Sequence, residues 1–174
     1  MSARIWTVGH SNRSIAELLE ILRVVPIARL VDVRTYPRSK RNPQFDSDNL
    51  AWELEQVGVA YRHAPELGGM RKPIPESINT AIVEPGFRGY ADHMQTEKFA
   101  AGIEQLLLEA GKSATTVMCA EASPWQCHRA FLCDALSVRD AEIRHLVDAR
   151  RTEPHRLNPL ARVSGPQVTY PGLL

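Results

Sequence analysis

Hydrophobic and polar positions divide the chain into short β-rich runs and longer stretches with helical spacing. Several of the short runs are almost continuously apolar, which is typical of strands covered on both faces. They predict strands over residues 4–8, 28–34, 59–64, 114–120 and 141–147. In the longer stretches the apolar residues recur one turn apart. These predict helices over residues 14–25, 47–58, 96–111 and 123–138, and a short helix from Ala91.

Local signals at the helix starts support this reading. Ser14 and Glu17 have the spacing of a capping box, in which each side chain bonds the other's backbone N–H. Ser123 and Gln126 have the same spacing, with a proline between them at the first helical position. The last helix is therefore expected to begin at Ser123, with Cys127 in its first turns.

Strands that alternate with helices predict an α/β fold. We expect three layers, with a mainly parallel, Rossmann-like sheet of about five strands flanked by helices. The expected strand order is 3-2-1-4-5, with the first strand beside the fourth. Residues 1–148 would form this single domain, and residues 149–174 an irregular basic tail that packs on it or trails from it.

Composition narrows the class of protein. The chain has 174 residues, of which 44% are hydrophobic and 24% charged, which fits a globular rather than a disordered protein. No apolar run reaches membrane-spanning length, and the N-terminal residues turn polar too soon for a secretory signal. We therefore expect a cytoplasmic protein with no membrane partner. Three clustered cysteines argue against a disulfide framework.

The expected carboxyl ends of the strands carry many reactive groups. Ligands bind beyond these ends in open parallel sheets, so side chains from separate segments would meet there. The candidate catalytic residues are Cys119 and Glu121 after the fourth strand, Cys127 and His128 in the next helix, and His10 after the first strand.

Cysteine and arginine chemistry suggests what such a site could do. A thiol at a helix start beside an arginine is favoured as the thiolate, which is the nucleophile. Cys127 is thus expected to be the most reactive cysteine, and Cys133 a small core residue. Guanidinium groups near a helix start suit phosphate or carboxylate. The candidate substrate-binding residues are Asp32, Arg34, Arg38, Arg41, Gly68, Gly69, Arg71, Arg88, Tyr90 and Arg129.

Cofactor signatures are missing from the sequence. Neither a GxGxxG nor a Walker motif occurs, so we expect no nucleotide cofactor. Neither CxxC nor HExxH occurs, so we expect no metal, although Cys119, Cys127, His128 and His10 could in principle assemble as ligands. Redox pairing of Cys119 with Cys127 stays open.

Five segments occur in the order TVGHSNRS, LVDVRTYPRSKRNPQF, YRHAPELGGMR, FRGYADHM and MCAEASPWQCHR. Together they resemble the domain-of-unknown-function 488 family, over about residues 5–148. The resemblance implies an α/β domain but no reaction. It singles out as motif positions His10, Asp32, Arg34, Arg38, Gly68, Gly69, Arg88, Cys119, Glu121, Cys127, His128 and Arg129.

Three functions fit these observations. The leading hypothesis is an enzyme, a hydrolase or transferase, that acts on a phosphate-bearing substrate such as a nucleotide or nucleic acid. Cys119 or Cys127 would be its nucleophile or acid–base group. One alternative is a non-catalytic module that binds nucleotide or nucleic acid at the same edge. Another is a thiol-based redox or metal sensor. The oligomeric state stays open.

Overall fold

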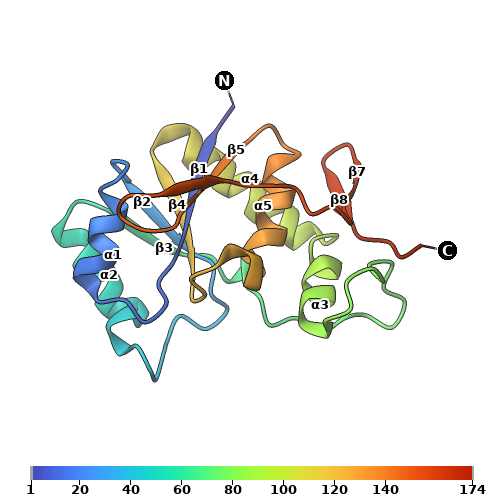
Figure 1. The fold of residues 1–174 in the computed structure, drawn as a ribbon, viewed down its shortest axis with the longest axis horizontal. Helices are drawn as coiled ribbons and strands as arrows, with labels where there is room; N and C mark the ends of the chain where they lie inside the picture. The colour runs from blue at the N-terminus through green and yellow to red at the C-terminus, as the bar shows by residue number, and fades with distance from the viewer. Residues whose placement is uncertain (1, 174) are drawn as a thin grey trace.

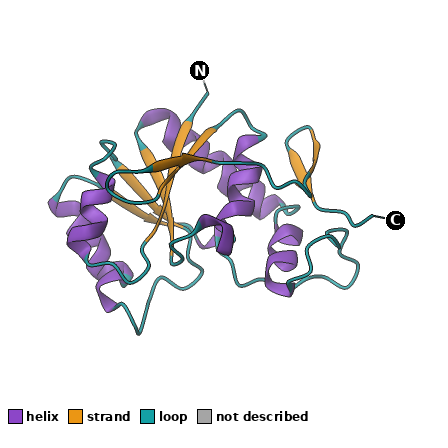
Figure 2. Ribbon diagram, viewed as in Figure 1, coloured by secondary structure: helices purple, strands orange, loops and turns teal. Residues whose placement is uncertain are grey.

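A computed structural model describes residues 2–173, which form a twisted six-stranded sheet between two layers of helices (Figures 1 and 2). The strand order is β3-β2-β4-β1-β5-β6. Five strands are parallel, and β6 joins the β5 edge in the antiparallel direction. Their bounds are β1 Arg4–Gly9, β2 Arg29–Asp32, β3 Ala60–His63, β4 Thr115–Cys119, β5 Glu142–Leu146 and β6 Thr152–Pro154. The three-layer α/β prediction is confirmed.

The order of the strands differs from the expected 3-2-1-4-5. β4 does pair with β1, as predicted, but it lies between β1 and β2 rather than outside them. All five residues of β4 are buried, so this strand suits the centre of the sheet, where both faces and both edges are covered. The carboxyl end of β4 therefore lies between the ends of β1 and β2.

Helices cover both faces of the sheet (Figure 2). On one face, α1 (Ile15–Leu22) and α2 (Ser47–Gln56) pack over a core that includes Val8, Leu30 and Met118. On the other face, α4 (Glu97–Lys112) and α5 (Arg129–Ser137) pack over a second core, together with α3 (Pro85–His93). Among residues 2–173, no helix is long and apolar enough to cross a membrane.

Two helix starts differ from the prediction. The capping box at Ser14 is present, but Ser123 makes no capping hydrogen bond. Pro124–Gln126 instead form one 3₁₀ turn, Cys127 is extended with φ −140° and ψ 153°, and α5 begins after it. Cys127 thus lies just before the helix and not in its first turns. The other exception is α3, which begins six residues before Ala91 because Glu84 accepts hydrogen bonds from Gly86 and Phe87.

The C-terminal segment is more ordered than expected. Besides β6, it contains a hairpin of β7 (Arg162–Ser164) and β8 (Gln167–Thr169), which lies beside α5 at the far end from α1 and α2 (Figure 1). Val168 is 3% exposed and Tyr170 is fully buried. The segment from residue 149 therefore packs on the α/β core and extends its sheet.

Candidate functional site

A cavity of about 460 Å³ opens at the carboxyl ends of β1, β2 and β4. Parallel strands deliver their carboxyl ends to one edge of a sheet, which is why residues far apart in sequence meet there. All five candidate catalytic residues line this cavity. Its lining consists of His10, Arg34, Thr35, Tyr36, Arg38, Ser39, Gly69, Met70, Cys119, Ala120, Glu121, Cys127 and His128.

Two backbone hydrogen bonds fix His10 beside Cys119. Past the end of β1, the amide of His10 donates to the carbonyl of Cys119 at 3.0 Å, and that of Ser11 donates to Ala120 at 2.8 Å. Gly9 permits this approach, because a Cβ there would overlap the backbone carbonyl of Glu121. The chain from β1 and the chain from β4 therefore stay paired into the cavity.

Cys119 and Cys127 form a thiol pair. Their sulfurs lie 2.9 Å apart, with Cys127 donating to Cys119, and they are 1% and 5% exposed. Burial alone would raise the pKa of Cys119, but the hydrogen bond from Cys127 and the charge of Arg129 outweigh it and lower that pKa. The same hydrogen bond, with burial, raises the pKa of Cys127. When the pair loses one proton, the negative charge is therefore expected on Cys119 and the remaining proton on Cys127.

This assignment reverses the order of reactivity that the sequence predicts for the two cysteines. Because Cys127 lies before the helix, its sulfur turns toward Cys119 and serves as a donor. Cys133 is fully buried, and burial raises its pKa. Cys119 is therefore the thiol with the best-stabilised anion.

His128 is held as a neutral proton acceptor. Its Nε2 lies 3.1 Å from the carbonyl of Val33, which can only accept, so Nε2 carries the proton and Nδ1 a lone pair. Nδ1 lies 3.4 Å from the Cys127 sulfur. Burial lowers the pKa of His128 to about 4. Gly69 leaves room for the ring, because a Cβ there would lie 2.8 Å from Nδ1.

Arg129 is a buried cation behind the thiol pair. It is 1% exposed, and its guanidinium donates to the carbonyls of Glu121 and Ala122 and to the hydroxyl of Thr7. It thereby holds the loop after β4, and its charge favours the Cys119 thiolate. Arg129 does not line the cavity, so its role in binding substrate is not direct.

His10 and Arg34 form one wall of the cavity. The Nδ1 of His10 donates to the carbonyl of Ser11 at 2.8 Å, and its ring stacks on Phe45 with centroids 4.5 Å apart. Its Nε2 lies 3.3 Å from Nη1 of Arg34. Burial, with a contribution from the charge of Arg34, lowers the pKa of His10, which is therefore neutral. Arg34 is itself ion-paired with Asp32.

The other predicted substrate-binding residues divide into two groups. Arg38 and Gly69 line the cavity, and Arg38 is exposed. Tyr90 is fully buried, with its hydroxyl donating to the carbonyl of Leu67. Gly68 packs against Thr35 instead. Those that do not line the cavity are Asp32, Arg41, Gly68, Arg71, Arg88, Tyr90 and Arg129. Asp32, Arg71 and Tyr90 are directed away from the cavity by contacts that residue type does not reveal.

Sequence reasoning missed part of the lining. Thr35 and Ser39 lie on the loop after β2, and their position after a strand end was a usable signal. Met70, 80% exposed, has a positive φ of 56°, which no sequence pattern around a non-glycine residue announces.

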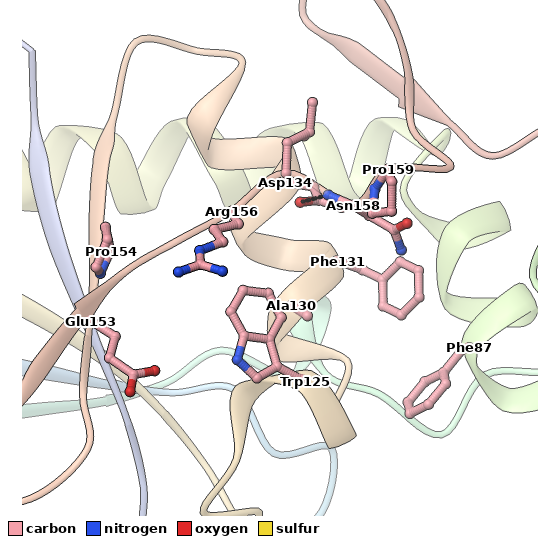
Figure 3. Close-up of a pocket in the computed structure, with 11 residues that line it drawn as sticks. Phe87, Trp125, Ala130, Phe131, Asp134, Glu153, Pro154, Arg156, Asn158 and Pro159 are labelled. Atoms are coloured by element: carbon pink, nitrogen blue, oxygen red, sulfur yellow. Dashed lines mark hydrogen bonds between the residues drawn. The ribbon is translucent and has the colours of Figure 1, made fainter.

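A second cavity, of about 550 Å³, lies beside α5 and the residues after β6 (Figure 3). Its lining includes Phe87, Trp125, Phe131 and Arg156. The cavity at the strand ends, lined by Cys119 and Cys127, is called the thiol cavity below. The second cavity is larger, but neither cysteine is in its lining. The thiol cavity is therefore the better candidate for chemistry.

The family comparison agrees with the sequence motifs. A family model described as "Domain of unknown function DUF488" matches residues 14–136. The chain belongs to this family. No curated protein and no solved structure matches it. The part matched by the DUF488 model contains Cys119, Cys127 and His128 but stops short of His10, which lies before residue 14.

Proposed function

We propose that this protein is an enzyme whose Cys119 thiolate attacks an electrophilic centre of a phosphate-bearing substrate, a nucleotide or nucleic acid. One observation carries this function. The thiol of Cys119, whose pKa is lowered by Cys127 and Arg129, lies in the wall of the 460 Å³ cavity beside the neutral His128. Nucleophilic catalysis needs an activated thiolate with a proton donor in reach.

The thiol pair supplies both groups. Cys119 forms a bond to the substrate, and the leaving group departs with the bonding electron pair and takes the proton of Cys127. That proton is tightly held while Cys119 is an anion, and it becomes transferable once Cys119 is bonded and neutral. Water then attacks the thio-intermediate, and the Cys127 thiolate takes back one proton from this water. His128 Nδ1, next to the Cys127 sulfur, is a neighbouring proton acceptor that can assist this transfer. Cys119 is released as the thiolate.

Positive charge on the loop after β2 supports an anionic substrate. Arg34 is neutralised by Asp32, whereas Arg38 lines the cavity and forms no ion pair within residues 2–173. Lys40 and Arg41 are exposed on the same loop. Arg38 is therefore the proposed contact for phosphate. We assign this activity to the cytoplasm, where thiols stay reduced.

Alkylation rates test this function. We expect iodoacetamide to label Cys119 faster than Cys127 or Cys133, and at lower pH than an ordinary thiol, as followed by peptide mass spectrometry. The Cys127→Ala variant should label more slowly, because it removes the hydrogen bond that lowers the pKa of Cys119. Labelling of Cys133 as fast as that of Cys119 would rule out a nucleophile at Cys119.

The substrate class is tested separately. Inorganic phosphate and a panel of nucleotides should slow the labelling of Cys119, and the Arg38→Gln variant should weaken this protection. Protection without turnover of any bound nucleotide would instead indicate a non-catalytic binding module. If neither phosphate nor any nucleotide slows labelling, the phosphate-bearing class is wrong.

A second candidate function rests on the short distance between the two sulfurs. At 2.9 Å, Cys119 and Cys127 are close enough to form a disulfide, as a thiol redox sensor would. Hydrogen peroxide would take the two electrons and be reduced to two waters. Rapid loss of both free thiols, reversed by dithiothreitol, would favour this function. Thiols that persist under stoichiometric peroxide would exclude it.

A further inference from the structure

A second group of cysteine and histidine side chains lies away from the thiol cavity. Cys133 on α5, His145 on β5 and His155 after β6 bring three ligand atoms within 4.8 Å of one another. Cys133 and His145 are 0% and 1% exposed, and the His155 side chain is 3% exposed. Three separate elements therefore direct soft or borderline ligands to one buried point.

The outer nitrogens of the two histidines have oxygen partners. Nδ1 of His145 lies 2.6 Å from the hydroxyl of Thr7, and Nε2 of His155 lies 2.7 Å from Oδ1 of Asp134. Histidines that bind a metal usually donate their other N–H in this way, to a carboxylate or another oxygen. The carboxylate of Asp134 is also held by the hydroxyl of Tyr170 at 2.7 Å, so this partner is fixed.

The inner nitrogens face each other. Nε2 of His145 and Nδ1 of His155 are 3.1 Å apart. If both outer nitrogens carry protons, both inner ones present lone pairs, and two lone pairs repel unless a cation lies between them.

We propose that Cys133, His145 and His155 bind one transition-metal ion, for which zinc is the first candidate. Thiolate and imidazole are the ligands that zinc prefers, and three protein ligands leave a fourth position for water. The ion would displace the thiol proton of Cys133, and the negative charges of that thiolate and of Asp134 would offset two of the three positive charges on the ion and Arg129. This differs from the sequence-based expectation of no metal, and it uses none of the thiol-cavity residues.

The ion would tie the C-terminal segment to the core. His155 follows β6, whereas the other two ligands belong to α5 and β5. Trp125 stacks on the His155 ring, with centroids 5.4 Å apart and planes at 17°, and covers it on the side of the second cavity. Trp125 and Asp134 both line that cavity (Figure 3). Metal binding should therefore stabilise the folded chain.

Cobalt binding provides the test. The full chain, purified without a histidine tag and stripped with a chelator, is titrated with Co²⁺. We expect one ion per chain, a near-ultraviolet thiolate-to-cobalt absorption, displacement by Zn²⁺ and a higher melting temperature. The Cys133→Ser variant should lose the thiolate absorption, whereas the matched Cys127→Ser variant should keep it. A Thr7→Val variant, which removes the oxygen partner of His145, should bind about 10–100-fold more weakly.

The alternative is a proton in place of the ion. In that case Thr7 donates to His145, His145 to His155, and His155 to Asp134, and the apo protein takes up no cobalt. That result overturns the metal site, as does an absorption that is lost with Cys127→Ser and kept with Cys133→Ser. If Cys133→Ser does not fold, His155→Gln serves instead, and its metal content must fall. Cys119 labelling, measured in parallel, reports on the thiol cavity independently.

Discussion

The guanidinium of Arg34 is paired with both carboxylate oxygens of Asp32, through Nε at 2.9 Å and Nη2 at 2.7 Å. Their side chains are only 6% and 0% exposed. The hydroxyl of Tyr61 also donates to Asp32, and Nη2 of Arg34 also donates to the carbonyl of Phe45. Because both charges have lost their water, each depends on the other. Arg34 lines the thiol cavity, and its charge is already neutralised by Asp32.

Removal of one partner of this pair should destabilise the fold strongly. The Asp32→Asn variant leaves the Arg34 cation buried without its counter-charge, which costs about 3–5 kcal/mol. Urea unfolding followed by circular dichroism measures this loss. The matched control is Glu142→Gln, which breaks the exposed pair with Arg4 and should cost about 0–1 kcal/mol. Equal losses in the two variants would contradict the role of burial.

The stability of the chain should fall in mild acid. Burial lowers the pKa of His128 to about 4, below the value of about 6.5 expected in the unfolded chain. The unfolded state therefore binds a proton as the pH falls below 6.5, while the folded state does not until about pH 4. The free energy of unfolding decreases through this window, by up to about 1.4 kcal/mol per pH unit for this residue. The lowered pKa of His10 acts in the same direction.

Urea unfolding at several pH values, with a chelator present, measures this slope. In the His128→Gln variant the slope should be shallower, because the residue that titrates is gone. The slope, rather than the absolute stability, is the readout, so a less stable variant remains informative. A free energy of unfolding that stays constant between about pH 6.5 and pH 4.5 would be inconsistent with a buried neutral His128.

Strand ends made the cavity predictable from sequence. His10, Cys119 and Glu121 lie at or just after the ends of β-rich runs, and parallel strands bring such positions to one edge whatever the strand order. Side-chain direction was not predictable in the same way. Tyr90 and Arg129 have residue types that suit ligand binding, but the structure uses their polar groups for backbone carbonyls and the Thr7 hydroxyl. Such contacts depend on tertiary packing.

The C-terminal strands could not be predicted from local patterns. β6 is three residues long and ends in Pro154, and short segments with proline carry a weak strand signal. Its pairing with β5 is what brings His155 to His145, ten residues earlier in the chain. The cluster with Cys133 therefore became visible only once β6 was placed at the sheet edge.

Tyr170 should be essential for the stability of the whole domain. It is fully buried, its hydroxyl donates to Asp134 at 2.7 Å, and its ring contacts Phe131 edge-on at 5.2 Å. Tyr170→Ala leaves a cavity and an unpaired acceptor, which costs about 3–5 kcal/mol. Thermal unfolding measures the change. Tyr36→Ala, at a residue that is 69% exposed, is the control and should change stability by roughly 0.5 kcal/mol or less. A small loss at Tyr170 would mean that the C-terminal segment contributes little to the core.

A methyl group at Gly69 should disturb the thiol site. The Cβ of Gly69→Ala would lie 2.8 Å from Nδ1 of His128, so the ring must shift and its contact with Cys127 must change. We expect slower iodoacetamide labelling of Cys119 and a loss of about 1–3 kcal/mol from overpacking. Gly111→Ala is the matched control, because it lies in α4 with nothing within 4 Å of its Cβ. That variant should gain about 0.5–1 kcal/mol from helix propensity and leave labelling unchanged. If Gly69→Ala labels at the normal rate, His128 does not position the thiol pair.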